Sequence, residues 1–382
     1  MPGAYLDHAA TTPLRPEAAA AMLPWLGERF GNPSGSHAVA RAARQAIDEA
    51  RDVVAEALGA QPGEIVFTGG GTEADNLAIV GVAAAHRDAS PPLCSAVEHH
   101  AVLHACTALG GATVPVDPAG RIRLDALEEA LAAATNAGHA PAVVSVMLAN
   151  NEVGVIEPLE DVIDLVRRLS PGTAVHTDAV QAFPWLDVAT FAAAADLVAI
   201  SAHKFGGPQG VGALVVREGV SLQPLLHGGG QERDRRSGTH NVAGIVGMAA
   251  AMAATVEARE ATVARVAVLR DRLANGLLAA VPGAHETGDR STKIAGNCHV
   301  RFPGVESEAL LVLLDDAGIC ASAGSACTSG AIEPSHVLLA MGIERDDALT
   351  SIRFSLGVTT GESDVDLALK VVPDAVARLR EG

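Results

Sequence analysis

The stretch Asp196-Leu-Val-Ala-Ile-Ser201-Ala-His-Lys204-Phe-Gly-Gly207 joins an apolar run to a lysine on a glycine-containing loop. The run predicts a buried strand, which places Lys204 at its carboxyl end, where open α/β sheets hold their ligands. Only three of the 27 basic residues are lysines, the others being Lys293 and Lys370. Because an amine can lose its proton and attack a carbonyl whereas a guanidinium cannot, Lys204 is a candidate nucleophile. A loop lysine that is merely exposed is the alternative.

The length and composition indicate a soluble protein. A chain of 382 residues is long enough for two domains. Its longest clearly apolar run, residues 242–254, is shorter than the roughly 20 residues that span a bilayer. The N-terminus has no basic region followed by an apolar one, so no secretory signal is visible.

The net charge and the cysteines limit partners and location. A formal net charge of −18 argues against direct binding to nucleic acid or to an anionic membrane surface. The five cysteines, at positions 94, 106, 298, 320 and 327, form no CxxC pair and leave one over, which is typical of reduced thiols. We therefore expect a cytoplasmic protein.

The first two thirds of the chain alternate between strand and helix patterns. Strands are expected near residues 64–68, 93–97, 113–116, 142–148, 174–178, 196–201 and 212–217. Helices are expected at 36–58, with Ser36 as cap, and near 73–86, 101–109, 124–134 and 158–169. Several strands are apolar almost throughout, so the pattern predicts an α/β fold with a mostly parallel sheet covered on both faces.

The alternation of strand and helix patterns ends after about residue 240. A long helix is expected over 241–280, followed by strands near 298–302 and 350–355 and helices near 306–316 and 362–380. This pattern predicts a second, smaller α+β domain. We expect a large domain over 13–255 and a small domain formed by 1–12 and 256–382.

A glycine-rich loop, Gly69-Gly-Gly-Thr72-Glu-Ala-Asp75, separates an expected strand from an expected helix. Glycines let a ligand approach the backbone, and the free N–H groups of the helix attract an anion such as phosphate. An ordinary turn, with Thr72 as the helix cap and Asp75 reaching back to it, is an equally good interpretation.

Polar side chains follow four of the expected strands. His99 and His100 follow the strand at 93–97, Asn150 follows 142–148, and Asp178 ends 174–178. With Lys204 they meet at one edge of a parallel sheet, where Asp178 is suited to hold a pyridinium nitrogen protonated. Each residue alone has a structural alternative, such as a helix cap for Asp178 or exposure for the histidines.

Two further residues suggest chemistry in the last third of the chain. Cys327 lies in Ala321-Ser-Ala-Gly-Ser-Ala-Cys-Thr-Ser-Gly330, a run of small residues that we expect to leave its thiol accessible as a nucleophile. A metal site is not expected there, because no second ligand stands at suitable spacing. Arg353 is embedded in an apolar strand, which favours an ion pair, for instance with a ligand carboxylate.

These motifs together resemble the cysteine desulfurases of the class-V aminotransferase family, which have the type I fold of pyridoxal-phosphate (PLP) enzymes with a sheet of the seven-stranded type. The similarity runs along nearly the whole chain. It is carried by Tyr5-Leu-Asp-His-Ala-Ala-Thr-Thr-Pro13, Gly31-Asn-Pro-Ser34, Gly71-Thr-Glu-Ala-Asp-Asn76, Asn150-Asn-Glu-Val-Gly154, Asp178-Ala-Val-Gln181, Ser201-Ala-His-Lys204, Arg236-Ser-Gly-Thr239, Gly324-Ser-Ala-Cys-Thr328 and Arg353-Phe-Ser355. The run around Cys327 is similar to that of the branch serving iron–sulfur cluster assembly.

The resemblance implies PLP as the cofactor, and it implies residues that hold it. Lys204 would form the Schiff base and later carry a proton at the substrate's α-carbon, while Asp178 would pair with the pyridine nitrogen. His99 would stack on the ring and serve in catalysis. Gln181 and Asn150 would bond the ring oxygen. The phosphate would be held by Gly71, Thr72, Ser201, His203 and, from the neighbouring subunit, Thr239.

The resemblance also implies the substrate and the product. Arg353 would bind the carboxylate of L-cysteine, with Asn150 beside it. Cys327 would attack the substrate sulfur, which leaves alanine and an enzyme persulfide for a sulfur-acceptor protein of iron–sulfur cluster assembly or thiolation. A homodimer is expected, because Thr239 would complete the other subunit's site. A selenocysteine lyase and a non-catalytic sulfur-carrier scaffold are the alternatives.

Overall fold

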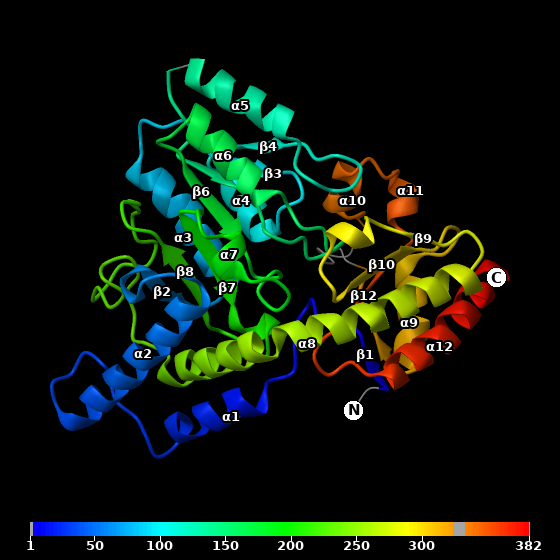
Figure 1. Ribbon diagram of the computed structural model, residues 1–382, viewed down its shortest axis with the longest axis horizontal. Coiled ribbons are helices and arrows are strands. Elements are labelled where there is room, and N and C mark those ends of the chain that lie inside the picture. Colours follow the sequence, from blue (N-terminus) through cyan, green and yellow to red (C-terminus); the bar gives the residue numbers. More distant parts are fainter. Residues whose placement is uncertain (1–2, 137, 324–332, 382) are drawn as a thin grey trace.

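The computed structural model describes residues 3–136, 138–323 and 333–381. A seven-stranded sheet forms its centre (Figure 1). Its spatial order is β2 (Ile65–Thr68), β8 (Gly212–Val216), β7 (Leu197–Ser201), β6 (Ala174–Asp178), β5 (Val143–Ser145), β3 (Leu93–Ser95) and β4 (Ala112–Val114). Only β8 runs antiparallel to its neighbours among these strands, so the expected α/β class with a mostly parallel sheet is confirmed.

Helices cover both faces of this sheet because its strands are apolar on both sides. Alternate strand residues enter two cores: Val175 and Val198 face one, while Leu197 and Ala199 face the other. The second core contains α3 (Gly71–Ala85) and α4 (His100–Ala108). The first contains α1 (Pro16–Met22), α2 (Ala38–Ala57), α5 (Leu124–Asn136), α6 (Leu159–Leu169), α7 (Val188–Phe191) and the start of α8 (Val242–Ala280).

The smaller domain packs around β10 (Asn297–Arg301), which is antiparallel to both β12 (Ser351–Ser355) and β9 (His285–Glu286). Beside it, β1 (Ala4–Tyr5) pairs in parallel with β11 (Ile319–Cys320), so the first residues of the chain join this domain. Its helices are α9 (Ser307–Asp316), α10 (His336–Ala340), α11 (Arg345–Ala348) and α12 (Glu362–Glu381). Figure 1 shows α8 running from the large sheet to this domain.

The helix α8 belongs to both domains. Ile245 and Met252 lie in the core of the large sheet, whereas Val266 and Leu273 lie in the core of the small domain. We therefore propose that the domain boundary, expected near residue 255, lies inside a continuous helix. By length and composition α8 could cross a membrane, but half of its most apolar stretch is buried in the protein, as in a core helix of a soluble protein.

Two helix starts differ from expectation. Ser36 does not cap α2; the ring of His37 accepts the hydrogen bond from the backbone N–H of Ala40. The helix α3 begins at Gly71 instead of near Glu73, because Gly70 adopts a positive φ of 147° that glycine tolerates. Thr72 therefore lies inside the first turn of α3 rather than capping it.

Candidate active site

A cavity of about 410 Å³ lies at the carboxyl ends of β5, β6 and β7, between the sheet and the small domain. This volume suits a small-molecule ligand. Most of the residues singled out from the sequence line it, namely Gly71, Thr72, His99, Asp178, Gln181, Ser201, His203, Lys204 and Arg353. The expectation that strand ends deliver these groups to one edge therefore agrees with the geometry.

Lys204 follows β7 in a short 3₁₀ turn and reaches into the cavity. Its Nζ donates hydrogen bonds to the carbonyl oxygens of Ala9 and Ala10, at 2.6 and 2.9 Å. Burial, and secondarily the positive charge of Arg353, lowers the pKa of Lys204 to about 8. A substantial fraction of the amine is therefore neutral near physiological pH, as a nucleophilic lysine requires.

Asp178 closes β6 at the bottom of the cavity. One of its carboxylate oxygens accepts a hydrogen bond from the backbone N–H of Val180 at 2.8 Å. Burial raises the pKa of Asp178 to about 6, while the Val180 N–H and the charge of Lys204 act in the opposite direction. The carboxyl is therefore suited to pair with a cationic ring nitrogen, which would restore its charge.

His99 is the N-cap of α4, and its Nδ1 accepts a hydrogen bond from the backbone N–H of Ala101 at 3.1 Å. That contact leaves the proton on Nε2. Burial, followed by the charge of Lys204, lowers the pKa of His99 to about 4. The ring is therefore a neutral, flat surface at the cavity edge.

The N-terminus of α3 forms one end of the cavity. The N–H groups of its first turn have no partner within the helix, so they attract an anion. A Cβ added at Gly71 would lie 3.0 Å from Val180 and 3.3 Å from Ser201, so glycine keeps this approach open. His203 stands nearby, with Nδ1 bonded to the Thr11 hydroxyl at 3.1 Å.

Arg353 reaches the cavity from β12 of the small domain. Its Nη2 forms a 3.0 Å ion pair with Asp7, and its Nη1 donates to the carbonyl of Asn151 at 3.0 Å. Its Nε is buried and has no partner among the described residues. The expected carboxylate site beside Arg353 already has one protein carboxylate, that of Asp7, in it.

The two asparagines after β5 have different surroundings. The fully buried Asn150 donates to the carbonyl of Val97 and accepts from the backbone N–H groups of Glu152 and Val153, at 2.8 to 2.9 Å. These bonds hold the turn. Asn151, not Asn150, lines the cavity. We therefore correct the expectation and propose that Asn151 makes the ligand contacts assigned to Asn150.

For two expected site residues the structure shows no place in this cavity: one lies elsewhere, and the other is not described. Thr239 lies exposed on the loop after β8 and does not line it. Cys327 lies outside the described residues, so its position relative to Lys204 stays a prediction. Of the other cysteines, Cys94 is buried in β3 and Cys320 ends β11.

Two acidic groups at or beside the cavity had no assigned role in the sequence. Asp7, in the N-terminal motif, reaches Arg353 because β1 pairs with β11 and Asp7 itself bridges to Ser355 of β12. Asp75 lines the cavity and lies beside Asp178 and His99, with one ligand atom of each within 4.8 Å of the others. Asp75 stands in the Gly-Thr-Glu-Ala-Asp motif at the sheet edge. This position in the sequence was the feature that could have identified it as a site residue.

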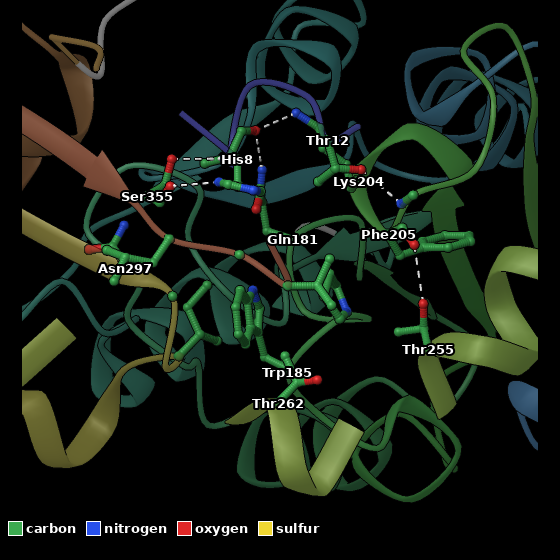
Figure 2. Close-up of a pocket in the computed structure, with 18 of the residues that line it drawn as sticks. His8, Thr12, Gln181, Trp185, Lys204, Phe205, Thr255, Thr262, Asn297 and Ser355 are labelled. Carbon is green, nitrogen blue, oxygen red and sulfur yellow. Dashed lines mark hydrogen bonds between the residues drawn. The ribbon is translucent and has the colours of Figure 1, made fainter. Parts of the chain in front are cut away.

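A second, narrower cavity of about 40 Å³ adjoins the first at Lys204 and Gln181. Figure 2 shows Trp185 and Phe205 of the large domain, Thr255 of α8 and Ser355 of β12 around it. The side-chain amide of Gln181 donates to the carbonyl of Ala9 at 2.6 Å and so lies between the two spaces. The second cavity has room for a few water molecules.

Comparisons with known proteins agree with this geometry. The model of the class-V aminotransferase family matches residues 4–368. The chain is 48% identical to the "IscS-like cysteine desulfurase" of Mycobacterium tuberculosis, over 99% of this chain and 97% of the relative. It is 44% identical to the "Cysteine desulfurase IscS" of Methanosarcina thermophila, over 98% and 92%.

Solved structures show the same fold. A "NIFS-LIKE PROTEIN" superposes with a TM-score of 0.90 at 35% identity and covers 99% of this chain and 100% of its own. The structure titled "SspA in complex with cysteine" has a TM-score of 0.80 at 31% identity and covers 94% and 100%.

Proposed function

This chain belongs to the class-V aminotransferase family, and on that premise we propose that it is a PLP-dependent cysteine desulfurase. It converts L-cysteine to L-alanine and passes the sulfur to an acceptor protein. One observation carries the proposal: a single cavity joins an amine of lowered pKa (Lys204), a buried carboxyl (Asp178) and a helix N-terminus to an arginine from the other domain.

The residues of the cavity fit PLP. The first turn of α3 at Gly71 and Thr72, with Ser201 and His203, suits the phosphate, and the space that a Cβ at Gly71 would fill stays open. Asp178 suits the pyridine nitrogen and His99 the ring face, while Gln181 and Asn151 suit the ring oxygen. When bound, PLP supplies an electron sink for bond breaking in the amino acid.

Arg353 orients the substrate by its carboxylate. A charge-assisted, two-pronged contact between a guanidinium and a carboxylate fixes both position and direction. Because Asp7 already pairs with this guanidinium, the substrate carboxylate shares or replaces that pairing. The competition makes Asp7 a determinant of substrate affinity.

Lys204 moves a proton at the substrate's α-carbon. Its lowered pKa, caused first by burial, lets the amine both accept and release a proton near neutral pH. The carbonyl oxygens of Ala9 and Ala10 hold Nζ in place while it is not engaged with a ligand.

Cys327 is the proposed sulfur acceptor. Its thiolate attacks the sulfur of the substrate, a sulfur–sulfur bond forms, and the substrate's carbon–sulfur bond breaks. L-cysteine and the Cys327 thiol thus become L-alanine and the Cys327 persulfide. The persulfide then passes its outer sulfur to an acceptor protein of the cytoplasm that serves iron–sulfur cluster assembly or thiolation.

The active unit is a homodimer. Thr239 is exposed on the surface of one chain, so it is free to complete the phosphate site of a second copy. Large apolar side chains are also exposed near the N-terminus of α2, namely Leu23, Leu26, Phe30 and Val39. Such a group of exposed apolar residues is typical of a protein interface.

The test of the function is mass spectrometry after one turnover with L-cysteine. The wild type and Cys320→Ser should carry a persulfide, whereas Cys327→Ser should bind PLP and L-cysteine but release almost no alanine or sulfide. A persulfide that survives Cys327→Ser and is lost in Cys320→Ser would overturn the nucleophile. A protein without PLP would favour a carrier scaffold, and turnover of selenocysteine alone would favour a lyase.

A further inference from the structure

Asp75 and His176 form a buried polar pair beneath the cavity that the proposed function does not use. Asp75 is 1% exposed and His176 is fully buried. Asp75 Oδ1 and His176 Nε2 lie 3.5 Å apart, and neither atom has a hydrogen-bond partner among the described residues. Buried polar atoms without a partner are costly and rare, so the pair calls for an explanation.

The strand pattern places these groups on one face of the sheet. His176 and Asp178 are two residues apart on β6, so both side chains point to the side covered by α3. Ser145 of β5 is the register partner of His176, and its hydroxyl lies 2.8 Å from His176 Nδ1. Asp75, in the second turn of α3, completes a row that ends at Asp178.

The charges around Asp75 disfavour the ionised form of its carboxyl group. Near it are Asp178 and His176 of β6 and Glu98 and His99 at the start of α4, and Lys204 lines the same cavity. Burial, then the charges of Asp178 and Glu98, raises the pKa of Asp75 well above its usual value. Burial lowers the pKa of His176 to about 3, so the imidazole is neutral.

We propose that Asp75 is a positioning residue: it stays protonated beside Asp178, with its proton directed to His176, so that the cavity floor carries one carboxylate charge, on Asp178. In this arrangement Asp75 Oδ1–H donates to His176 Nε2 after a small side-chain adjustment, and His176 Nδ1–H donates to the Ser145 hydroxyl. One proton explains both unpartnered atoms. The inference rests on the proposed function, in which Asp178 holds the ring nitrogen of PLP.

A negative charge on Asp75 would change how well Asp178 binds the ring nitrogen. Were Asp75 ionised, its negative charge would lie close to Asp178 and raise the pKa of that carboxyl further. Asp178 would then be protonated more often, and it would hold a cationic ring nitrogen less well. Asp75 thus acts through Asp178 by adding no second negative charge to the cavity beside it.

The first test needs no cofactor. The infrared spectrum of the protein without PLP, at neutral pH, should show the carbonyl stretch of a protonated carboxyl that is missing in Asp75→Asn. Glu157→Gln is the matched control, because burial raises the pKa of Glu157 to about 8 at a site outside the cavity. It should also lose a carboxyl band. If Asp75→Asn loses only an ionised-carboxylate band, Asp75 is charged and the proposal is wrong.

The second test reads the site with PLP bound. In the wild type, the absorption of the bound cofactor should change at alkaline pH as Asp75 ionises. Asp75→Asn, whose amide can donate to His176 but cannot ionise, should lose this alkaline step, whereas Glu157→Gln should keep it. Asp75→Leu, which has no donor and cannot ionise either, should also lose the alkaline step. An alkaline step that persists unchanged in Asp75→Asn would overturn the proposal.

The measurements distinguish a wrong proposal for the function from a wrong proposal for Asp75. A wild type that binds no PLP contradicts the function while the infrared result still decides the protonation of Asp75. A wild type that binds PLP and turns over L-cysteine, but has an ionised Asp75 at neutral pH, contradicts the inference alone.

Discussion

The two walls of the cavity are assembled in different ways. The large-domain wall, formed by His99, Asp178 and Lys204, stands at the ends of neighbouring parallel strands of one sheet. The small-domain wall is centred on Arg353, which is held by Asp7 from the N-terminus and by a carbonyl of the loop after β5. The first wall is fixed by one sheet, whereas the second depends on three segments from distant parts of the chain.

Because of this difference, we expect the two walls to have separate tasks, cofactor binding and substrate binding. Because the large-domain wall carries the proposed cofactor residues, its loss should abolish cofactor binding or chemistry at any substrate concentration. Because the small-domain wall carries the proposed substrate residue, its loss should weaken substrate binding while the cofactor stays in place. Variants on either side therefore test whether the two walls act independently.

The largest effect is expected for Lys204→Ala on the large-domain wall. Removal of the amine takes away both the covalent attachment of PLP and the proton carrier, so sulfide release should fall by roughly 10²–10⁴-fold or more. The measurements are sulfide release and the absorption of the bound cofactor. A hydroxylamine-sensitive absorption band that persists in Lys204→Ala would mean that another residue attaches the cofactor.

A smaller effect, confined to substrate binding, is expected for Arg353→Ala. A charge-assisted hydrogen bond is worth about 1.5–3 kcal/mol, so KM for L-cysteine should rise about 10–150-fold. The cofactor absorption should not change in intensity. Asp7→Asn is the control: it removes the competing carboxylate and should lower KM or leave it unchanged. A loss of bound PLP in Arg353→Ala would show that the walls are coupled.

The two adjacent asparagines after β5 have different expected roles: Asn150 stabilises the turn, and Asn151 contacts the ligand. Asn150→Ala leaves buried backbone groups unpaired and should lower the free energy of unfolding by about 1–3 kcal/mol. Asn151→Ala should leave stability nearly unchanged and weaken PLP binding by about threefold to tenfold. Chemical denaturation and PLP titration measure the two effects. The opposite pattern would restore Asn150 as the ligand residue.

The smallest effect concerns pH and connects the two walls. Because the pKa of Lys204 is lowered to about 8, half of the amine is neutral at pH 8, and the rate of PLP capture should level off above that pH and fall about tenfold per pH unit well below it. Burial is the main cause, and the charge of Arg353 is the second. In Arg353→Ala the plateau should therefore begin at a higher pH, in stopped-flow absorption. An unchanged plateau would mean that Arg353 does not influence the amine.

The residues of the large-domain wall could be predicted from the sequence because they follow their strands directly along the chain. Apolar runs predict strands, parallel strands collect ligands at their carboxyl ends, and Asp178 and Lys204 follow such runs directly. The same reasoning was wrong for Asn150. In a tight turn, consecutive side chains point in different directions, and no pattern tells which of two asparagines faces the cavity.

The small-domain wall and Asp75 needed tertiary information. The contact of Asp7 with Arg353 depends on pairing between a two-residue strand at the N-terminus and one near residue 320, which leaves no periodic signal. For Asp75, the expected helix start placed it among capping residues. The actual start at Gly71 moves it into the second turn, where it faces the sheet.

The pairing of β1 with β11 also constrains how the protein is made. Ala4 and Tyr5 leave the ribosome long before their partners, Ile319 and Cys320, are synthesised. The sheet of the large domain can form while the nascent chain is still growing, whereas the N-terminal segment must wait unpaired. A truncated product that lacks its last quarter would therefore contain the large sheet yet lack both Arg353 and a fixed position for Asp7. Only a chain that already includes β12 can bring Arg353 and Asp7 together at the cavity.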